Sequence, residues 1–216
     1  MEESAAAHAY GYLIQPEVRF LDAAVARLIP ADELGPGAKE ADVTYFIDRQ
    51  LVSSWGTHGR NYRMGPWPEG TPQQGFQSPL TPQEIYRAAI RETNIYCNKQ
   101  YGKRFDLLAP EQQDEVLHGL EDGKIELESV SSKLFFGLLL RNTEEGFFSD
   151  PMYGGNRDKI GWRLIGFPGV AASDYAQHME EYNVPYRVEP VSILDIEQKR
   201  VQVDAQGYPK HVKLKD

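Results

Sequence analysis

Histidine and acidic side chains could bind a metal ion, but their spacing does not give a complete ligand set. The only Glu-x-x-His pair is Glu115 and His118, which stand three residues apart. A carboxylate-bridged di-iron site needs two such Glu-x-x-His pairs and two further Glu. The residue three before His178 is Tyr175, so a second pair is missing. We predict that Glu115 and His118 form a surface pair and that this chain holds no metal.

The single cysteine, Cys97, limits the redox chemistry of the chain. An intrachain disulfide, covalent c-type haem and cysteine-ligated iron–sulfur clusters all require further cysteines. We predict that Cys97 is a small buried residue. A disulfide to another subunit is the alternative, and it would require an oxidising compartment.

Phosphate-binding and nucleophile motifs are absent from the sequence. The Gly-rich segment 154–161 does not match Gly-x-x-x-x-Gly-Lys-Ser/Thr, and no strand is expected before it. We interpret this segment as backbone that turns sharply around packed aromatic side chains. No Gly-x-Ser-x-Gly elbow occurs either. The sequence therefore predicts no catalytic and no cofactor-binding residues.

An active site assembled from residues distant in sequence remains the alternative. The adjacent acidic pairs 144–145 and 180–181 point apart on a helix, which is typical of solvated surface. A free-standing enzyme would assemble its site around Glu145, Asp150, Tyr153 and Arg157. A soluble module that caps a sugar site is a further alternative.

Two segments combine aromatic residues, Gly, Pro and Arg without a helical period. They lie at residues 62–68, within a loop expected over 54–79, and at residues 147–162. Trp, Tyr, Met and Arg are enriched at the centres of protein interfaces. The candidate partner-interface residues are Tyr62, Trp67, Phe76, Phe148, Met152, Tyr153, Asn156, Arg157 and Trp162. The alternative is that both loops fold back on the chain's own core.

Helices must position these loops. Apolar spacing and helix-start signals predict helices over residues 16–29, 38–51, 82–101, 110–120, 131–148 and 173–182. Alternating valines around residues 204–207 favour a small hairpin, and an arm held by a partner is equally plausible. We expect a mainly α fold: an irregular helical domain (1–182) with long Gly/Pro/aromatic loops, and a short β-prone C-terminal arm or hairpin (183–216).

Composition and charge narrow the classes of partner. The net charge of the 216-residue chain is −9, which argues against nucleic acid and anionic lipid as main partners. The longest apolar run, residues 134–140, is too short to span a bilayer. Residues 1–12 contain neither Lys nor Arg nor an apolar core, so no leader peptide is visible.

The sequence resembles the gluconate 2-dehydrogenase subunit 3 family, the small subunit of bacterial flavin dehydrogenase complexes. The most specific piece is Phe-Phe-Ser-Asp-Pro-Met-Tyr-Gly-Gly-Asn-Arg-Asp at residues 147–158. The other matching pieces lie, in order, at residues 28–32, 34–38, 46–51, 65–68, 80–82 and 161–169. The resemblance covers about residues 20 to 170 and leaves out the tail after residue 182.

This resemblance implies a mostly helical, non-catalytic accessory subunit without a cofactor of its own. Its partner would be a large FAD-containing subunit of the glucose–methanol–choline type that oxidises a sugar or sugar acid. A multihaem cytochrome c subunit, with haem c, would complete the complex at the membrane. Small subunits of this family often carry a twin-arginine leader and are exported with the flavoprotein. We therefore expect a periplasmic location with the leader removed.

Overall fold

The computed structural model describes residues 8–59, 62–68, 70–74, 77–171, 178 and 181–214. Its longer helices are α1 (Gln15–Leu28), α2 (Val43–Val52), α4 (Pro82–Tyr101), α5 (Pro110–Glu121) and α6 (Ser132–Phe148). Shorter ones are α3 (Ser54–Thr57), η1 (Pro72–Gln74), η2 (Phe105–Leu107), η3 (Pro151–Tyr153), η4 (Arg157–Lys159), α7 (Ile160–Ile165) and α9 (Ile193–Glu197). The predicted mainly α fold is confirmed.

Local sequence signals set the ends of the best-predicted helix, α4. The Glu84 backbone N–H donates to the Thr81 hydroxyl oxygen at 3.3 Å, and the Thr81 N–H donates to the Glu84 carboxylate at 2.8 Å. These two hydrogen bonds satisfy backbone donors that the first turn leaves free. At the other end Gly102 adopts a φ of 71°, a left-handed conformation that glycine reaches without strain. The predicted bounds of α4 are therefore correct.

One continuous core joins α1, α2, α4, α5 and α6. Its largest fully buried side chains include Tyr86, Phe20, Phe105 and Phe135. The rings of Phe20 and Phe105 stand 4.6 Å apart, and Tyr86 meets Phe135 edge to face at 5.5 Å. Cys97 is buried beside them, as predicted, and burial raises the pKa of its thiol to about 12. At neutral pH this thiol is therefore protonated and unreactive.

Three predicted elements differ from the structure. The second helix begins at Val43 rather than near residue 38, because residues 38–42 form turns that end with Asp42 at a φ of 59°. Helix α7 lies in a stretch predicted to be irregular, and α9 lies in the β-prone tail. The predicted helix over 173–182 falls mostly outside the described residues.

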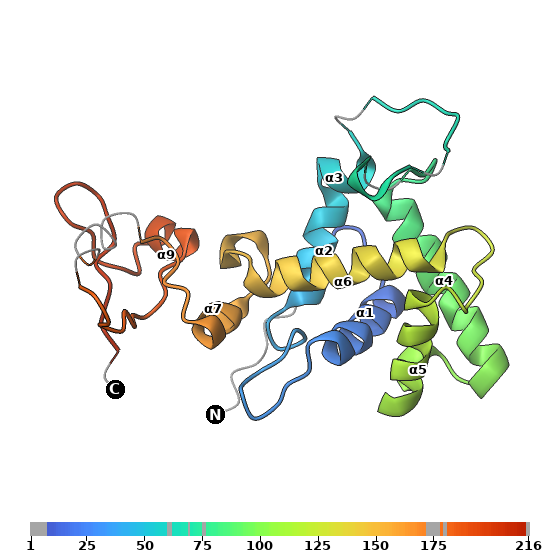
Figure 1. Cartoon of the computed structure of the whole chain (residues 1–216), viewed down its shortest axis with the longest axis horizontal. Helices are drawn as coiled ribbons and strands as arrows, with labels where there is room; N and C mark the ends of the chain where they lie inside the picture. Colours follow the sequence, from blue (N-terminus) through green and yellow to red (C-terminus); the bar gives the residue numbers. More distant parts are fainter. Residues whose placement is uncertain are drawn as a thin grey trace.

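The tail forms isolated bridges rather than strands within the described residues. Val203 forms a single bridge with Pro209 across the predicted turn at 204–207, so a tight turn is present there without the two strands of a hairpin. Gly169 pairs with Val191, and the Val170 N–H donates to the Val191 carbonyl at 2.8 Å. The C-terminal segment is thereby joined to the chain that follows α7. Figure 1 shows this segment, with α9, at the α7 end of the molecule.

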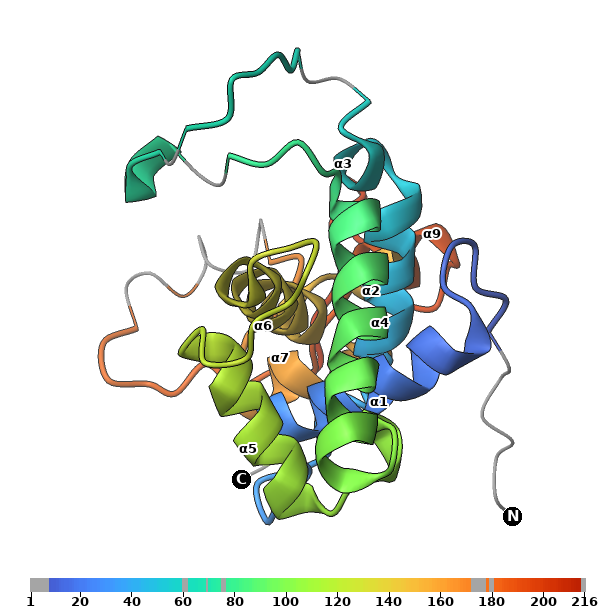
Figure 2. The same ribbon diagram turned by 90° about the vertical axis from the view of Figure 1, so that its right-hand side faces the viewer.

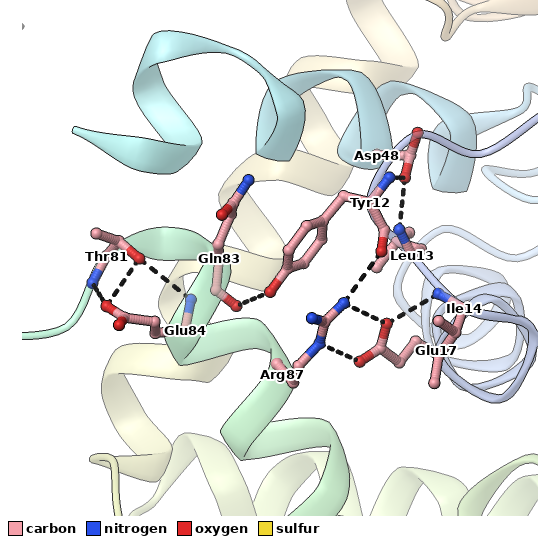
Figure 3. Close-up of polar contacts among 9 residues, drawn as sticks. All are labelled: Tyr12, Leu13, Ile14, Glu17, Asp48, Thr81, Gln83, Glu84 and Arg87. Atoms are coloured by element: carbon pink, nitrogen blue, oxygen red, sulfur yellow. Dashed lines mark hydrogen bonds and ion pairs between the residues drawn. The ribbon is translucent and has the colours of Figure 1, made fainter. Parts of the chain in front are cut away.

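An N-terminal strap, residues 8–14, crosses α2 and α4. The buried Asp48 carboxylate accepts hydrogen bonds from the backbone N–H groups of Gly11, Tyr12 and Leu13 at 2.7, 2.9 and 2.8 Å. On α4, the Arg87 guanidinium donates to the Tyr12 carbonyl at 3.0 Å and stands 4.1 Å from the centre of the Tyr12 ring (Figure 3). The strap is therefore held by polar contacts to two helices.

Candidate partner-binding site

The segment from Phe147 to Trp162 leaves the end of α6 and returns through η3 and η4 into α7. Asp150 fixes its first turn, because one carboxylate oxygen accepts from the Met152 N–H at 3.0 Å. The other oxygen accepts from the Ile193 N–H at 2.7 Å. A single side chain therefore ties this segment to the C-terminal tail.

Asn156 holds the middle of the same segment from within. Its side chain is 0% exposed, and its amide donates to the Ser149 carbonyl and accepts from the Gly161 N–H, both at 2.8 Å. Asn156, Asp158 and Lys159 have φ values of 49°, 55° and 59°. Left-handed backbone is costly for residues other than glycine and persists only where the surroundings enforce it. Three hydrogen bonds hold this backbone in place. Two are those of the Asn156 side chain, and the third runs from the Arg157 N–H to the Ala41 carbonyl at 3.1 Å.

Two glycines allow the segment to lie directly against α6. A Cβ atom on Gly155 would stand 2.2 Å from the Gly146 carbonyl oxygen. A Cβ atom on Gly161 would stand 2.1 Å from the Phe147 carbonyl oxygen. Both distances are far below van der Waals contact. The Gly-rich segment is therefore a sharp turn that packs against the backbone of α6, whereas the sequence predicted a sharp turn around aromatic side chains.

Arg157 belongs to a charged and aromatic cluster at the start of α2. Its guanidinium forms an ion pair with Asp42 and stands 3.2 Å from His8 Nε2. The His8 ring stacks on Tyr45 with centroids 4.1 Å apart, and its Nε2 lies 2.9 Å from the Asp42 carboxylate. Arg157 thus uses its charge within the chain, where it links the segment to the strap.

Beside this cluster lies a cavity of about 510 Å³, lined by His8 of the strap and by three further segments distant in sequence. It has Asp42 and Tyr45 on one side, the 151–159 turn on another, and Ser192 to Arg200 on the third. On its wall Lys159 pairs with Asp195 at 2.9 Å. Burial alone would raise the pKa of Asp195, but hydrogen bonds from Ser192 and Lys159 lower it below its usual value. This carboxylate therefore stays ionised at neutral pH.

The four residues of the alternative active site do not face one cavity. Arg157 lines the cavity just described, whereas Glu145 lines a separate one of about 180 Å³ with Trp55 and Asn142. Glu145 pairs there with Arg141 at 2.8 Å. Tyr153 is exposed. The structure thus does not assemble these residues into a catalytic constellation.

The 62–68 segment lies in the long loop between α3 and α4. The Arg63 guanidinium donates to the carbonyls of Ser78 and Leu80, the latter at 3.3 Å, and stands 4.9 Å from the centre of the Trp67 ring. Tyr62 is 89% exposed and Trp67 is 37% exposed. Phe76, the third candidate of this loop, lies outside the described residues.

The two predicted segments therefore differ in how their candidate residues lie. Asn156 and Trp162 are buried, and the Trp162 indole donates to the Phe148 carbonyl at 2.7 Å. These two shape the loop from inside. The exposed candidates are Tyr62, Trp67, Phe148 and Tyr153, and the half-buried ones are Met152 and Arg157.

Sequence reasoning missed a groove between α7 and the tail. The groove has a volume of about 800 Å³, and its lining mixes apolar with charged side chains: Leu164, Ile165, Pro185, Leu214, Arg163, Arg187 and Glu189, among others. Leu164 and Ile165 are half exposed. No local signal marked the groove, because its two walls come from segments that the sequence reading treated as irregular. The contacts of Asp48 and Asp150 were also missed, since their partners lie about 40 residues away.

The described part of the chain shows neither a group of metal ligands nor a bilayer-spanning helix. Within the described residues, no group of three or more His, Cys, Asp or Glu side chains is placed to hold a metal ion. His118 pairs with Glu121 at 3.2 Å, and Glu115 accepts from the Tyr101 hydroxyl at 3.0 Å. Of the helices in the described ranges, none has the length and apolarity needed to cross a bilayer.

A model of the gluconate 2-dehydrogenase subunit 3 family matches residues 15–169, which include both aromatic segments and the helices between them. The chain belongs to the gluconate 2-dehydrogenase subunit 3 family. Membership of the subunit 3 family makes it a subunit of such a dehydrogenase complex. No curated protein and no solved structure matched the chain.

Proposed function

We propose that this chain is the non-catalytic small subunit of a flavin-dependent gluconate or sugar dehydrogenase complex. It binds and stabilises the FAD-containing catalytic subunit of the glucose–methanol–choline type. It also assists the export of that subunit to the periplasm and its assembly with a multihaem cytochrome c subunit. Family membership supports a place in such a complex, and the finer roles are our proposal.

The supporting structural observation is the set of large side chains that the chain leaves exposed on its family-specific loops. Tyr62, Trp67, Phe148 and Tyr153 are all at least one-third exposed. Exposed aromatic side chains grouped on rigid loops are typical of protein interfaces. The internal hydrogen bonds of Asn156 and Asp150 fix the second loop before any partner arrives. Binding then costs less conformational entropy.

Co-production with the flavoprotein tests this proposal. The two subunits should copurify with bound FAD, and the small subunit alone should show no dehydrogenase activity. Trp67→Ala and Tyr153→Ala should each weaken the complex by about 2 kcal/mol or more, with little loss of stability in the lone chain. Leu107→Ala, at an exposed position on η2, is the matched control. Failure to copurify, or activity of the lone chain, would refute the proposal.

A second candidate function, binding of a small polar ligand such as a sugar, is favoured by the cavity beside Arg157. Its volume of about 510 Å³ falls in the range of small-molecule sites, roughly 300–1,000 Å³. Gluconate or glucose should then raise the melting temperature of the lone chain. Arg157→Gln should abolish that rise in melting temperature. An unchanged melting temperature at millimolar sugar would remove this candidate.

A further inference from the structure

The loop between α3 and α4 stands apart from the helices that it connects. Figures 1 and 2 show it leaving α3 and returning to α4 well outside the helical body. Its described residues 62–68 include Tyr62 at 89% and Met64 at 72% exposure. The second aromatic segment instead lies against α6, where Gly155 and Gly161 permit close contact. Of the two segments, the α3–α4 loop is therefore the one that protrudes.

Arg63 fixes the base of this protruding loop. Its guanidinium donates to the carbonyls of Ser78 and Leu80 on the returning chain and also lies over the Trp67 ring. The two arms of the loop are thereby linked near α4. The side chains on either side of Arg63, Tyr62 and Met64, remain outside this link. The Tyr62 hydroxyl donates to the Met64 sulfur at 3.6 Å, so these two exposed side chains lie together.

The loop suits docking as a bent, proline-containing turn, because the chain bends at Gly65. The Gly65–Pro66 peptide bond is cis. Residues 64–68 read Met-Gly-Pro-Trp-Pro, and residues 62–68 contain neither helix nor strand. Proline lacks a backbone N–H, so Pro66 and Pro68 cannot extend a β-ladder through that group. The segment is therefore not one that pairs with the edge of a partner's sheet. A protrusion of this kind is complementary to a concave surface and not to a flat one.

The charge of the loop differs in sign from that of the whole chain. The loop spans residues 58–80, between α3 and α4. It carries Arg60 and Arg63 against Glu69, whereas the whole chain has a net charge of −9. A partner groove with an acidic rim would complement this local positive charge.

We propose that the α3–α4 loop inserts into an apolar, acid-rimmed groove of the FAD-containing subunit, with Tyr62 and Met64 as its inserted side chains. This rests on the proposed function, since it names how the two subunits join. In this arrangement the catalytic subunit supplies the concave surface. Arg63 acts as a positioning residue that keeps the two arms of the loop together.

Affinity between the separately purified full-length subunits tests the insertion. A Tyr62→Ser/Met64→Ser double variant should bind the flavoprotein about tenfold or more weakly, because a few central anchors dominate interface affinity. Its melting temperature should equal that of the wild type, since both side chains contact solvent. Leu34→Ser, at a 73% exposed position in another turn, is the matched control and should bind like the wild type.

Competition separates insertion from ordinary surface packing. A synthetic peptide of residues 60–80, which keeps Arg63 together with its acceptors on Ser78 and Leu80, should displace the wild-type chain from the flavoprotein, whereas a scrambled peptide should not. Binding of the double variant within twofold of wild type would overturn the proposal. So would a weakened double variant combined with a peptide that fails to compete, since the loop would then act only as part of a folded face. Absence of any wild-type complex would instead refute the proposed function itself.

Discussion

Substitution of Asp48 by Asn should release the N-terminal strap. The Asp48 carboxylate is 2% exposed and accepts three backbone N–H groups, two on one oxygen and one on the other. An amide keeps one acceptor oxygen and turns the other position into a donor. With the oxygen retained toward Tyr12 and Leu13, the new NH₂ group would face the Gly11 N–H. One charge-assisted hydrogen bond is lost and two donors then oppose each other.

The expected cost is about 2 kcal/mol, because hydrogen bonds to charged groups contribute about 1.5–3 kcal/mol. Urea slopes for a chain of this size are about 3 kcal/mol/M, so the unfolding midpoint should fall by roughly 0.7 M. Hydrogen exchange provides the local assay. The amides of Gly11, Tyr12 and Leu13 should exchange faster in Asp48→Asn, whereas amides in the middle of α4 should change only with global stability.

Asp158→Asn is the matched control, since Asp158 is exposed and Asn tolerates its left-handed backbone. It should leave both the midpoint and the strap amides unchanged. A midpoint for Asp48→Asn within about 0.2 M of wild type, or unchanged exchange at Gly11 to Leu13, would refute the reasoning. The strap would then be held mainly by its apolar contacts.

Three further changes probe the family-specific segment and its link to the tail. Asn156→Asp removes the donor to Ser149 and should lower the free energy of unfolding by about 2–3 kcal/mol in urea titrations. Gly155→Ala places a methyl group against a carbonyl of α6 and should cost about 1–3 kcal/mol, seen as a lower melting temperature. The pKa of Asp195 in the folded chain is lower than its unfolded value of 3.8. Its contribution to the free energy of unfolding should therefore be complete above pH 3.8 and be lost as the pH falls through the lower folded-state pKa. In Asp195→Asn the free energy of unfolding should change less with pH in this range. If the variant and the wild type show the same dependence of stability on pH, the stabilising role of the Asp195–Lys159 pair is contradicted.

Prediction from sequence succeeded where local chemistry fixes the backbone. The Thr81 cap and Gly102 terminator set both ends of α4 without tertiary help. It failed at α2, because Ala38 and Ala41 fit an apolar helical pattern yet are buried as turn residues. It also missed α7, a short helix whose placement depends on its packing against the end of α6.

The tail shows that one available signal was overlooked. The backbone N–H of Asp195 donates to the Ser192 hydroxyl oxygen at 3.0 Å, and the Ser192 N–H donates to the Asp195 carboxylate at 3.0 Å. This Ser-x-x-Asp spacing starts α9 and is readable from the sequence. For the candidate interface, the sequence predicted which residue types take part but not which of their side chains are exposed. Which aromatic side chains turn inward, as Trp162 does, depends on hydrogen bonds to distant backbone such as the Phe148 carbonyl.

The protruding α3–α4 loop also determines how the small subunit would fare without its partner. Exposed loop backbone rich in small residues is where proteases cut most readily. A chain produced alone would therefore be cleaved first between α3 and α4, while its helical core stays intact. Production of the two subunits in equal amounts would then protect the small subunit from degradation and also allow the complex to form.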